Sequence, residues 1–504
     1  MKKISIRFVC LIILITATLG FSQQSITLLH TNDIHGNFSS REAKEAEDGR
    51  KMTYGGFIAL KHYIDQIKKE TNDNYLLFDA GDFMTGTPIC DIDYQGAFGG
   101  ALISFLNYLD YDGLTLGNHE FDISVANAEA LMWLCDFPVF SANLFRKNGK
   151  LFTEKAYHIY EKNGLKIGVI GIIFHDLSGL LNKSQQQQIY SVGPVDIINK
   201  IATMIDAETD VIVVLSHSGI DVDSIIAQQL SDKVDIIIGG HSHTRLQKPQ
   251  VVNNIIIVQT GSQCSNLGRL DITVQNDRVV SFDGKLIFLD TENITEDAYL
   301  VAEVKKYNQL IDDQYGVVIA QLKEDWIRNR DGESNLGNFI CDRLREYTNA
   351  DIAVMNSGGI RKGLVAGPVT GLDIKEILPF NNQICVAKLS GRQIKRIVET
   401  NINGMHEGHS GILQVSGISY QYRINKKNEP EVVRILINGN PIDYYKTYLL
   451  ATVDYVFSNA DQYFGFSTPP YENLYAPAAE MIINLTKKMG VIDSKIEGRI
   501  VEVR

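Results

Sequence analysis

The sequence predicts an α/β protein of two domains, in which several buried strands end at one polar edge. Three observations predict it. The length of 504 residues suits two to three domains, apolar runs alternate with amphipathic stretches, and five of those runs lead directly into carboxylate, amide or imidazole side chains. Because ligands of open α/β sheets bind beyond the carboxyl ends of strands, the five polar ends are expected to converge on one site.

Composition narrows the range of partners. The chain is 44% hydrophobic and 21% charged, as a globular protein is, and its formal net charge is −12. An acidic chain of this kind offers no basic face for a nucleic-acid polymer. A small anionic substrate stays compatible, because bound metal ions can outweigh the net charge at a site.

The first 22 residues are predicted to be a signal peptide that is cleaved near Ser22. A basic start at residues 1–7 precedes a short apolar run at residues 8–19, and small residues follow it. The apolar run is too short for a membrane span, and no later stretch is long and apolar enough. We therefore expect an exported protein, periplasmic or secreted, without a membrane span.

The expected elements of the first domain, residues 23–295, follow in order. Apolar runs predict strands at residues 26–30, 75–78, 111–116, 165–173, 211–215, 234–238, 270–274 and 279–283, and a 3.6-residue period predicts a helix at 56–69. A charged helical connector is expected at 296–315. The second domain, residues 316–504, is expected to be another α/β unit that begins with a helix near 338–347 and a strand at 352–355. The polar tract 185–188 is expected to be a solvated loop.

Seven donor side chains stand at the predicted strand ends: Asp33, His35, Asp82, Asn118, His217, His241 and His243. Taken singly, an Asp at a strand end usually caps a turn and a His is usually a hydrogen-bonded core residue. Taken together, mixed oxygen and nitrogen donors suit divalent zinc, manganese or iron. Seven donors exceed the needs of one tetrahedral ion, so two divalent metal ions that share one carboxylate are expected.

These motifs resemble those of the calcineurin-like metallophosphoesterases, and most closely the 5′-nucleotidase branch. The resemblance rests on DxH at 33–35, GD at 81–82, GNHExD at 117–122, His217 and GGHSH at 239–243. It implies an N-terminal calcineurin-like αββα sandwich with a two-metal site, followed by a smaller α/β substrate-binding domain. It also implies one ion held by Asp33, His35, Asp82 and His243, and a second held by Asp82, Asn118, His217 and His241.

The chemistry expected of such a site is hydrolysis of a phosphoester. Two cations polarise a bound water for in-line attack and neutralise the phosphate oxygens. His119, which is not needed as a ligand, is placed to donate a proton to the phosphoryl or leaving oxygen, and Asp122 would orient its imidazole. The resemblance implies that His119 and Asp122 are the catalytic pair. Glu120 is expected only to support the loop.

Substrate selection is expected in the second domain. A glycine-rich turn at 356–361 ends in arginine, and aromatic residues at 380 and 455 can stack on a base. The resemblance implies that Phe380 and Tyr455 stack on the nucleobase, that Asp461 holds the ribose, and that Asn356 faces the base. It further implies contacts of Arg330 and Arg361 with phosphate and ribose, and close backbone approach at Gly359.

The chain departs from the related pattern before its ribose carboxylate. Relatives have Asn-Gly-Gly-Asp, whereas residues 458–461 read Ser-Asn-Ala-Asp, and Phe457 competes with Tyr455 for the stacking role. The predicted function is release of phosphate from nucleoside 5′-monophosphates in nucleotide catabolism or salvage. Two alternative activities that would use the same metals are hydrolysis of 2′,3′-cyclic nucleotides and hydrolysis of UDP-sugars. An alternative of another class is a catalytically silent nucleotide-binding surface protein.

Overall fold

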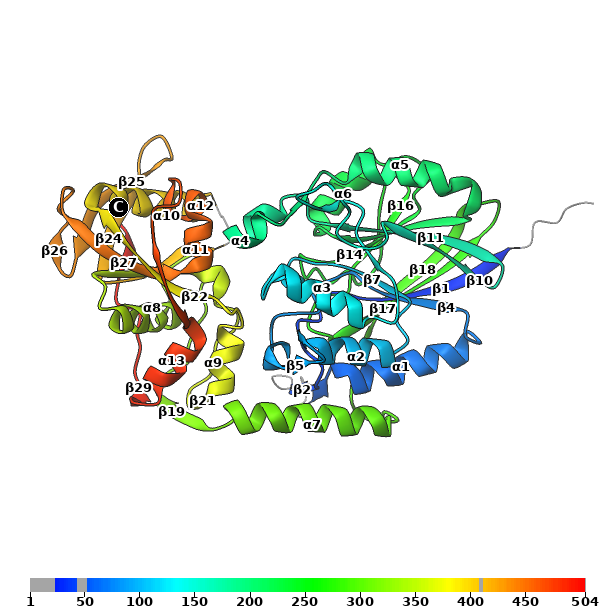
Figure 1. Ribbon diagram of the computed structural model, residues 1–504, viewed down its shortest axis with the longest axis horizontal. Coiled ribbons are helices and arrows are strands. Elements are labelled where there is room, and N and C mark those ends of the chain that lie inside the picture. The colour runs from blue at the N-terminus through cyan, green and yellow to red at the C-terminus, as the bar shows by residue number, and fades with distance from the viewer. Residues whose placement is uncertain (1–22, 43–51, 408–410, 504) are drawn as a thin grey trace, which may run out of the picture.

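The computed structural model describes residues 23–42, 52–407 and 411–503. They form two α/β domains that lie side by side and are joined by the helix α7 (Ala298–Tyr315) (Figure 1). The predicted signal peptide lies outside the described residues. Within them, no helix combines the length and the apolar character needed to cross a membrane.

The N-terminal domain contains two six-stranded sheets with largely parallel centres. The first has the strand order β18 (Val279–Phe288), β17 (Asn266–Val274), β1 (Gln24–Thr31), β4 (Tyr75–Asp79), β7 (Gly113–Thr115) and β8 (Val139–Phe140). The second has the order β10 (Tyr157–Lys162), β11 (Leu165–Ile173), β13 (Val211–His217), β14 (Ile236–Gly239), β16 (Ile255–Val258) and β15 (Gln250–Val252).

The two sheets pack face to face. Leu28 and Phe78 of the first sheet and Val213 and Ile238 of the second belong to one buried apolar cluster. Helices cover both outer faces, which completes the predicted αββα sandwich (Figure 1). Those on the first sheet are α1 (Gly56–Glu70), α2 (Gly100–Tyr108) and α3 (Val125–Leu134), and those on the second are α5 (Val195–Ile205) and α6 (Ile220–Gln229). Since the central strands β4, β13 and β14 are buried on both faces, their sequences are almost continuously apolar, whereas the outer strands β10 and β18 are partly exposed.

Short elements complete this domain. Three two-stranded ladders pair β2 (Arg41–Glu42) with β3 (Thr53–Tyr54), β5 (Asp93–Tyr94) with β6 (Ala97–Phe98), and β9 (Leu144–Arg146) with β12 (Ile189–Ser191). Single helical turns lie at η1 (Pro88–Asp91), η2 (His119–Phe121), η3 (Leu177–Leu180) and η4 (Asp206–Glu208). The helix α4 (Lys183–Gln186) takes up the first half of the tract predicted as a solvated loop at 185–188, whereas Gln187 and Gln188 form an exposed turn. The prediction was wrong for Gln185, which is buried and donates from its side-chain amide to the Phe121 carbonyl.

The C-terminal domain is built on three smaller sheets. The first has the strand order β23 (Leu413–Ser416), β20 (Ile352–Asn356), β27 (Thr447–Val453), β22 (Gln383–Ser390) and β28 (Glu472–Pro477). The second has the order β26 (Asn440–Pro441), β25 (Pro430–Ile437), β24 (Ile418–Ile424) and β30 (Ile500–Glu502). The third has the order β21 (Gly367–Thr370), β19 (Val318–Leu322) and β29 (Gly490–Ile492). Its helices are α8 (Asn335–Thr348), α9 (Gly371–Ile377), α10 (Gly391–His406), α11 (Asp454–Ser458), α12 (Ala460–Phe464) and α13 (Ala478–Thr486), with the turn η5 (Ser357–Gly359).

Contacts across the domain boundary hold the two units together. The helix α7 begins at the cap Asp297, whose carboxylate accepts from the Leu300 amide, and its apolar face is buried. Nearby, Lys375 of α9 lies 3.1 Å from Asp91 of η1, so the two domains share an ion pair beside the connector. The five cysteines in the described residues are free thiols, and four of them are buried.

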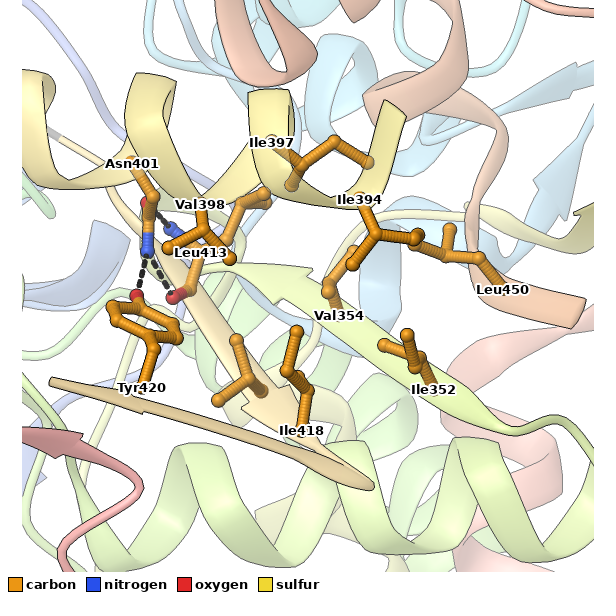
Figure 2. Close-up of a pocket in the computed structure, with 11 residues that line it drawn as sticks. Ile352, Val354, Ile394, Ile397, Val398, Asn401, Leu413, Ile418, Tyr420 and Leu450 are labelled. Atoms are coloured by element: carbon orange, nitrogen blue, oxygen red, sulfur yellow. Dashed lines mark hydrogen bonds between the residues drawn. The ribbon is translucent and has the colours of Figure 1, made fainter. Parts of the chain in front are cut away.

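An apolar pocket lies under α10 in the C-terminal domain (Figure 2). Its one polar anchor in the helix is Asn401, whose amide donates to the Leu413 carbonyl (3.0 Å) and to the Tyr420 hydroxyl (2.7 Å). The Asn401 oxygen accepts from the Leu413 amide at 2.7 Å. This side chain therefore ties the helix to the start of β23 and to β24.

We expect Asn401→Ala to lower the free energy of unfolding by about 3 kcal/mol, because buried backbone groups of Leu413 would lose their partners. Urea unfolding followed by circular dichroism measures the change. The matched control is Asn403→Ala, an exposed asparagine of the same helix, which should unfold as the wild type does. Equal midpoints for both variants would contradict the anchoring role of Asn401.

Candidate active site and metal centre

The carboxyl ends of the strands meet at one edge of the sandwich, as expected. Three groups of possible metal ligands form there, each with its ligand atoms within 4.8 Å of one another. They are Asp33, His35 and His243; His35, Asp82 and His119; and Asp82, His217 and His241. Because the groups share members, they make up one continuous cluster of carboxylate and imidazole donors.

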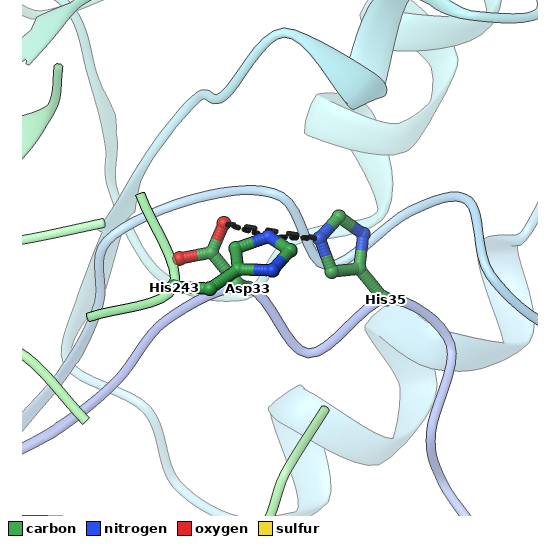
Figure 3. Close-up of side chains that lie close together, drawn as sticks. All are labelled: Asp33, His35 and His243. Carbon is green, nitrogen blue, oxygen red and sulfur yellow. Dashed lines mark hydrogen bonds and ion pairs between the residues drawn. The ribbon is translucent and has the colours of Figure 1, made fainter. Parts of the chain in front are cut away.

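The first group joins the ends of β1 and β14 (Figure 3). The Nδ1 atom of His35 lies 2.8 Å from the Thr85 carbonyl oxygen, and since a carbonyl only accepts, Nδ1 carries the proton. Its Nε2 atom therefore presents a lone pair, and it lies 3.0 Å from Nε2 of His243. Asp33 Oδ1 is 3.3 Å from the same His243 nitrogen. The two imidazole nitrogens and the carboxylate oxygen converge on one point, and a cation placed there would be bound by all three.

The second group lies around Asp82, which is buried. His217 donates from Nδ1 to the Ala80 carbonyl at 2.7 Å, which turns its Nε2 toward Asp82 Oδ2 at 3.0 Å. Burial lowers the pKa of His217, but the carboxylate of Asp82 outweighs it and raises the value to about 10, so a cation held at Asp82 would take the place of the Nε2 proton. The amide oxygen of Asn118 is buried and has no hydrogen-bond partner. A buried acceptor of this kind is costly unless a ligand satisfies it.

The backbone around the cluster is unusual. Five predicted ligands have a left-handed φ: Asp33 (51°), His35 (51°), Asp82 (58°), His241 (75°) and His243 (56°). Such conformations are unfavourable outside glycine and gather at functional sites. Gly117 allows the two loops to touch, because a Cβ there would lie 2.1 Å from Asp82 Oδ1.

The donor set fits divalent cations. Carboxylate, amide and unprotonated imidazole atoms are the ligands that zinc, manganese and iron accept. Burial holds the pKa of His35 at about 3, and it lowers that of His241 to about 4, which keeps both rings available as neutral ligands. When bound, such ions act as Lewis acids toward phosphate and toward water.

His119, which belongs to the cluster, forms a pair with Asp122. His119 Nδ1 lies 2.7 Å from Asp122 Oδ2, and Thr85 donates to the same carboxylate oxygen at 2.6 Å. Burial lowers the pKa of His119, but the carboxylates of Asp122 and Asp82 outweigh it and raise the value to about 9. A cation at Asp82 would oppose that part of the effect, whereas the bond to Asp122 would remain. The pair can therefore present a protonated imidazole to a substrate oxygen.

A cavity of about 640 Å³ opens between the two domains directly over this cluster. Its N-terminal wall contains Asp82, Asn118, His119, Asp122, His241 and His243. Its C-terminal wall contains Arg330, Asn356, Gly359, Arg361, Phe380 and Tyr455. The two walls approach each other at Phe380, whose ring centroid lies 5.7 Å from that of His119. On the C-terminal wall, the guanidinium of Arg361 lies 5.8 Å from the centre of the same Phe380 ring.

Two residues that were considered for substrate binding, Asp461 and Phe457, do not line the cavity. The structure does not place Asp461 on the cavity wall, and its side chain is exposed. The reason is local: the Asn459 amide donates to the Tyr455 carbonyl, and α12 begins at once, which turns Asp461 outward and Gln462 and Tyr463 inward. Phe457, the competitor of Tyr455, is fully buried and stacks on Tyr471.

Other cavity residues were missed by sequence reasoning. They are Ile123, Leu180, Asn182 and Gln185 on the N-terminal side and Asn381, Asn382, Gln383, Asp454, Gln462 and Tyr463 on the C-terminal side. Six of these ten are asparagine or glutamine residues that belong to none of the motifs named above. Tyr463 was detectable in principle, since it follows Tyr455 by eight residues across two short helices, and its ring lies 6.2 Å from that of Tyr455.

Comparison with known families agrees with this geometry. Residues 26–245 match the calcineurin-like phosphoesterases, and residues 318–468 match the 5′-nucleotidase C-terminal domain. The chain belongs to the 5′-nucleotidase family. The enzyme is therefore a metal-dependent phosphoric ester hydrolase with the two-domain fold of that family.

Individual relatives support the same assignment. The human 5′-nucleotidase is 28% identical over 94% of this chain and 90% of its own length. The trifunctional nucleotide phosphoesterase of Bacillus subtilis is 30% identical over 95% of this chain, which spans 35% of that longer protein. Among solved structures, the 5′-nucleotidase precursor of Thermus thermophilus superposes with a TM-score of 0.82 at 27% identity and covers 95% of this chain and 99% of its own.

Proposed function

We propose that this enzyme releases phosphate from nucleoside 5′-monophosphates with two bound divalent metal ions. The observation that carries the proposal is the shared cavity, which has metal-ligand side chains on one wall and aromatic and arginine side chains on the other. A nucleotide has matching ends, an anionic phosphate and a flat base. The basic start and short apolar run of residues 1–22 favour export, which N-terminal sequencing of the mature protein would test.

In this proposal the ligand atoms divide into two sets that share Asp82. Asp33, His35 and His243 complete one set, and Asn118, His217 and His241 complete the other. The ions would supply Lewis acidity at the phosphate. His119, oriented by Asp122, donates its Nε2 proton to the phosphoryl or leaving oxygen, and Arg361 and Arg330 attract the anion from the opposite wall.

The nucleoside end is proposed to bind at Phe380 and Tyr455, with Asn356 facing the base. The buried Asn356 amide oxygen has no hydrogen-bond partner, which favours a ligand donor at that point. Gly359 lies in the same wall and permits close approach of the backbone. No ribose contact is proposed for Asp461, because it is turned away from the cavity.

Phosphate release from a matched panel tests the proposal. The enzyme is assayed with AMP, UMP, UDP-glucose and 2′,3′-cyclic AMP in the presence of manganese or zinc, and again after exhaustive chelation. The monophosphates should be cut fastest, and chelation should abolish the reaction. Faster cleavage of UDP-glucose or of the cyclic diester would overturn the monoester assignment, and no hydrolysis at all would favour a silent nucleotide-binding protein.

Tyr455→Ala is expected to raise KM for AMP by about 10-fold or more, because loss of one stacked base costs about 1–3 kcal/mol. Ribose 5-phosphate has no base, so its KM should not change in the variant. Tyr445→Ala is the matched control, since Tyr445 is 82% exposed and lies outside the cavity wall. Equal effects on AMP and ribose 5-phosphate would show that Tyr455 does not contact a base.

A further inference from the structure

Glu120 is a buried carboxylate that the proposed chemistry does not use. It stands in η2 between His119 and Phe121 with only 1% of its surface exposed. It is not a member of the candidate metal groups and does not line the cavity. Burying a carboxylate costs folding free energy unless hydrogen bonds satisfy its oxygens, so Glu120 depends on the donors around it.

Those partners are three backbone N–H groups from two different loops. Glu120 Oε2 accepts from the Gly117 amide at 2.6 Å and from the Asp82 amide at 3.0 Å, and Oε1 accepts from the Met84 amide at 3.1 Å. One loop follows β4 and carries Asp82, and the other follows β7 and carries Asn118. Glu120 therefore bonds the backbones of two loops that supply proposed ligands.

The connection is reciprocal. The amide of His119 donates to Asp82 Oδ1 at 2.8 Å, so the loop that carries Glu120 also binds the side chain of Asp82. Asp82 has a left-handed φ of 58°, a conformation that is less favourable than the right-handed one for a residue with a Cβ and that these hydrogen bonds help to hold. With both its N–H and its carboxylate held, Asp82 has a defined backbone and side-chain position.

We propose that Glu120 is a positioning residue that sets the geometry of Asp82 and thereby the affinity of the site for metal. The inference rests on the proposed ligand set. A carboxylate is required because all three partners are donors, and two acceptor oxygens satisfy them. A glutamine of equal size would offer one oxygen and turn an NH₂ group toward at least one N–H.

Manganese binding to Glu120→Gln tests the proposal. The metal-stripped protein is titrated with Mn²⁺ and bound metal is counted after equilibrium dialysis, with kcat and KM for AMP measured at each concentration. We expect the midpoint of Mn²⁺ binding to rise by about 10–100-fold, as for other partners that orient metal ligands. KM for AMP should stay unchanged, and turnover should recover as Mn²⁺ is raised. A binding midpoint equal to that of the wild type would overturn the role.

Glu333→Gln is the matched control. Glu333 is also buried and accepts from the backbone amides of Glu497 and Arg499, both at 2.8 Å, but in the C-terminal domain. It should lose a similar amount of stability to the same substitution while keeping the wild-type Mn²⁺ midpoint. A rise in that midpoint would mean that general loosening, and not the position of Glu120, weakens metal binding, which overturns the proposal.

Hydrogen exchange on the wild type provides a test that needs no variant to fold. In metal-stripped protein, peptides that include the amides of 82, 84 and 117 should exchange slowly, because Glu120 holds them without metal. Exchange as fast as in the exposed loop 426–428 would overturn the proposal. A wild type that binds no Mn²⁺ would overturn the proposed ligands as well, whereas normal binding by Glu120→Gln would overturn only the role of Glu120.

Discussion

His119→Ala is expected to lower turnover of AMP by about 10²–10⁴-fold while the protein keeps its metal, because a positioned general acid contributes about that much. The ring lies on the cavity wall and is bonded to Asp122, yet it is not one of the proposed ligands. Loss of the ring therefore removes a proton donor without removing a metal donor. Steady-state kinetics and metal analysis on the same sample separate the two effects.

The choice of substrate shows which oxygen His119 serves. If it protonates the leaving group, p-nitrophenyl phosphate should suffer much less from the substitution than AMP, because its leaving group needs no proton. If it stabilises the phosphoryl oxygens, both substrates should slow alike. His406→Ala is the control, an exposed histidine at the end of α10 that should turn over as the wild type does. Near-normal turnover of AMP by His119→Ala would remove His119 from the mechanism.

The site was predictable from sequence where topology alone decides position. Asp33, Asp82 and Asn118 each stand just past a buried strand, and the strands that precede them are neighbours in one parallel sheet. Parallel neighbours bring their carboxyl ends to one edge, so local pattern was enough to place these side chains together. The long buried strands and the helix at 56–70 were equally predictable. A strand that is buried on both faces has a continuous apolar run, and a helix that is buried on one face has apolar residues at a period of 3.6.

The far wall of the cavity was much less predictable. Asp461 was expected there by resemblance, but the chain has Asn459-Ala460 in place of two glycines, and the Asn459 side chain bonds back to the Tyr455 carbonyl. The helix that begins at Ala460 then decides which neighbours face inward. Orientation of one residue in a short helix depends on such bonds, which single-sequence patterns do not encode.

Long-range packing explains the other failure. The tract 185–188 is polar and is predicted to be solvated, yet Gln185 is buried, because it takes part in the cap of α4 and donates to the carbonyl of Phe121 in η2. A buried amide is stable only when its hydrogen bonds are satisfied, and here the partner lies 64 residues away. Sequence reasoning therefore locates the residues at the strand ends better than it locates the residues of the C-terminal cavity wall.

Asp82→Asn is expected to lower the activity more than any substitution on the C-terminal wall of the cavity. Asp82 is the proposed shared ligand, and burial raises its pKa while His217 and His119 hold it well below the usual value, so its charge is strongly favoured. The variant keeps the size of the side chain but loses that charge for both metal sets. Since Lewis-acid stabilisation is worth several kcal/mol, turnover should fall by at least about 10³-fold, with bound metal reduced in parallel.

The control for Asp82→Asn is Asp235→Asn in the same domain. Asp235 Oδ2 accepts from the Ile212 amide at 2.9 Å, and the residue belongs to none of the candidate metal groups. It should lose some stability and keep its metal and its turnover. Metal analysis, turnover and thermal unfolding of both variants separate loss of metal from loss of stability. A folding defect lowers the unfolding temperature of either variant, whereas only Asp82→Asn should lose metal. Full metal content and wild-type turnover in Asp82→Asn would refute the shared-ligand arrangement.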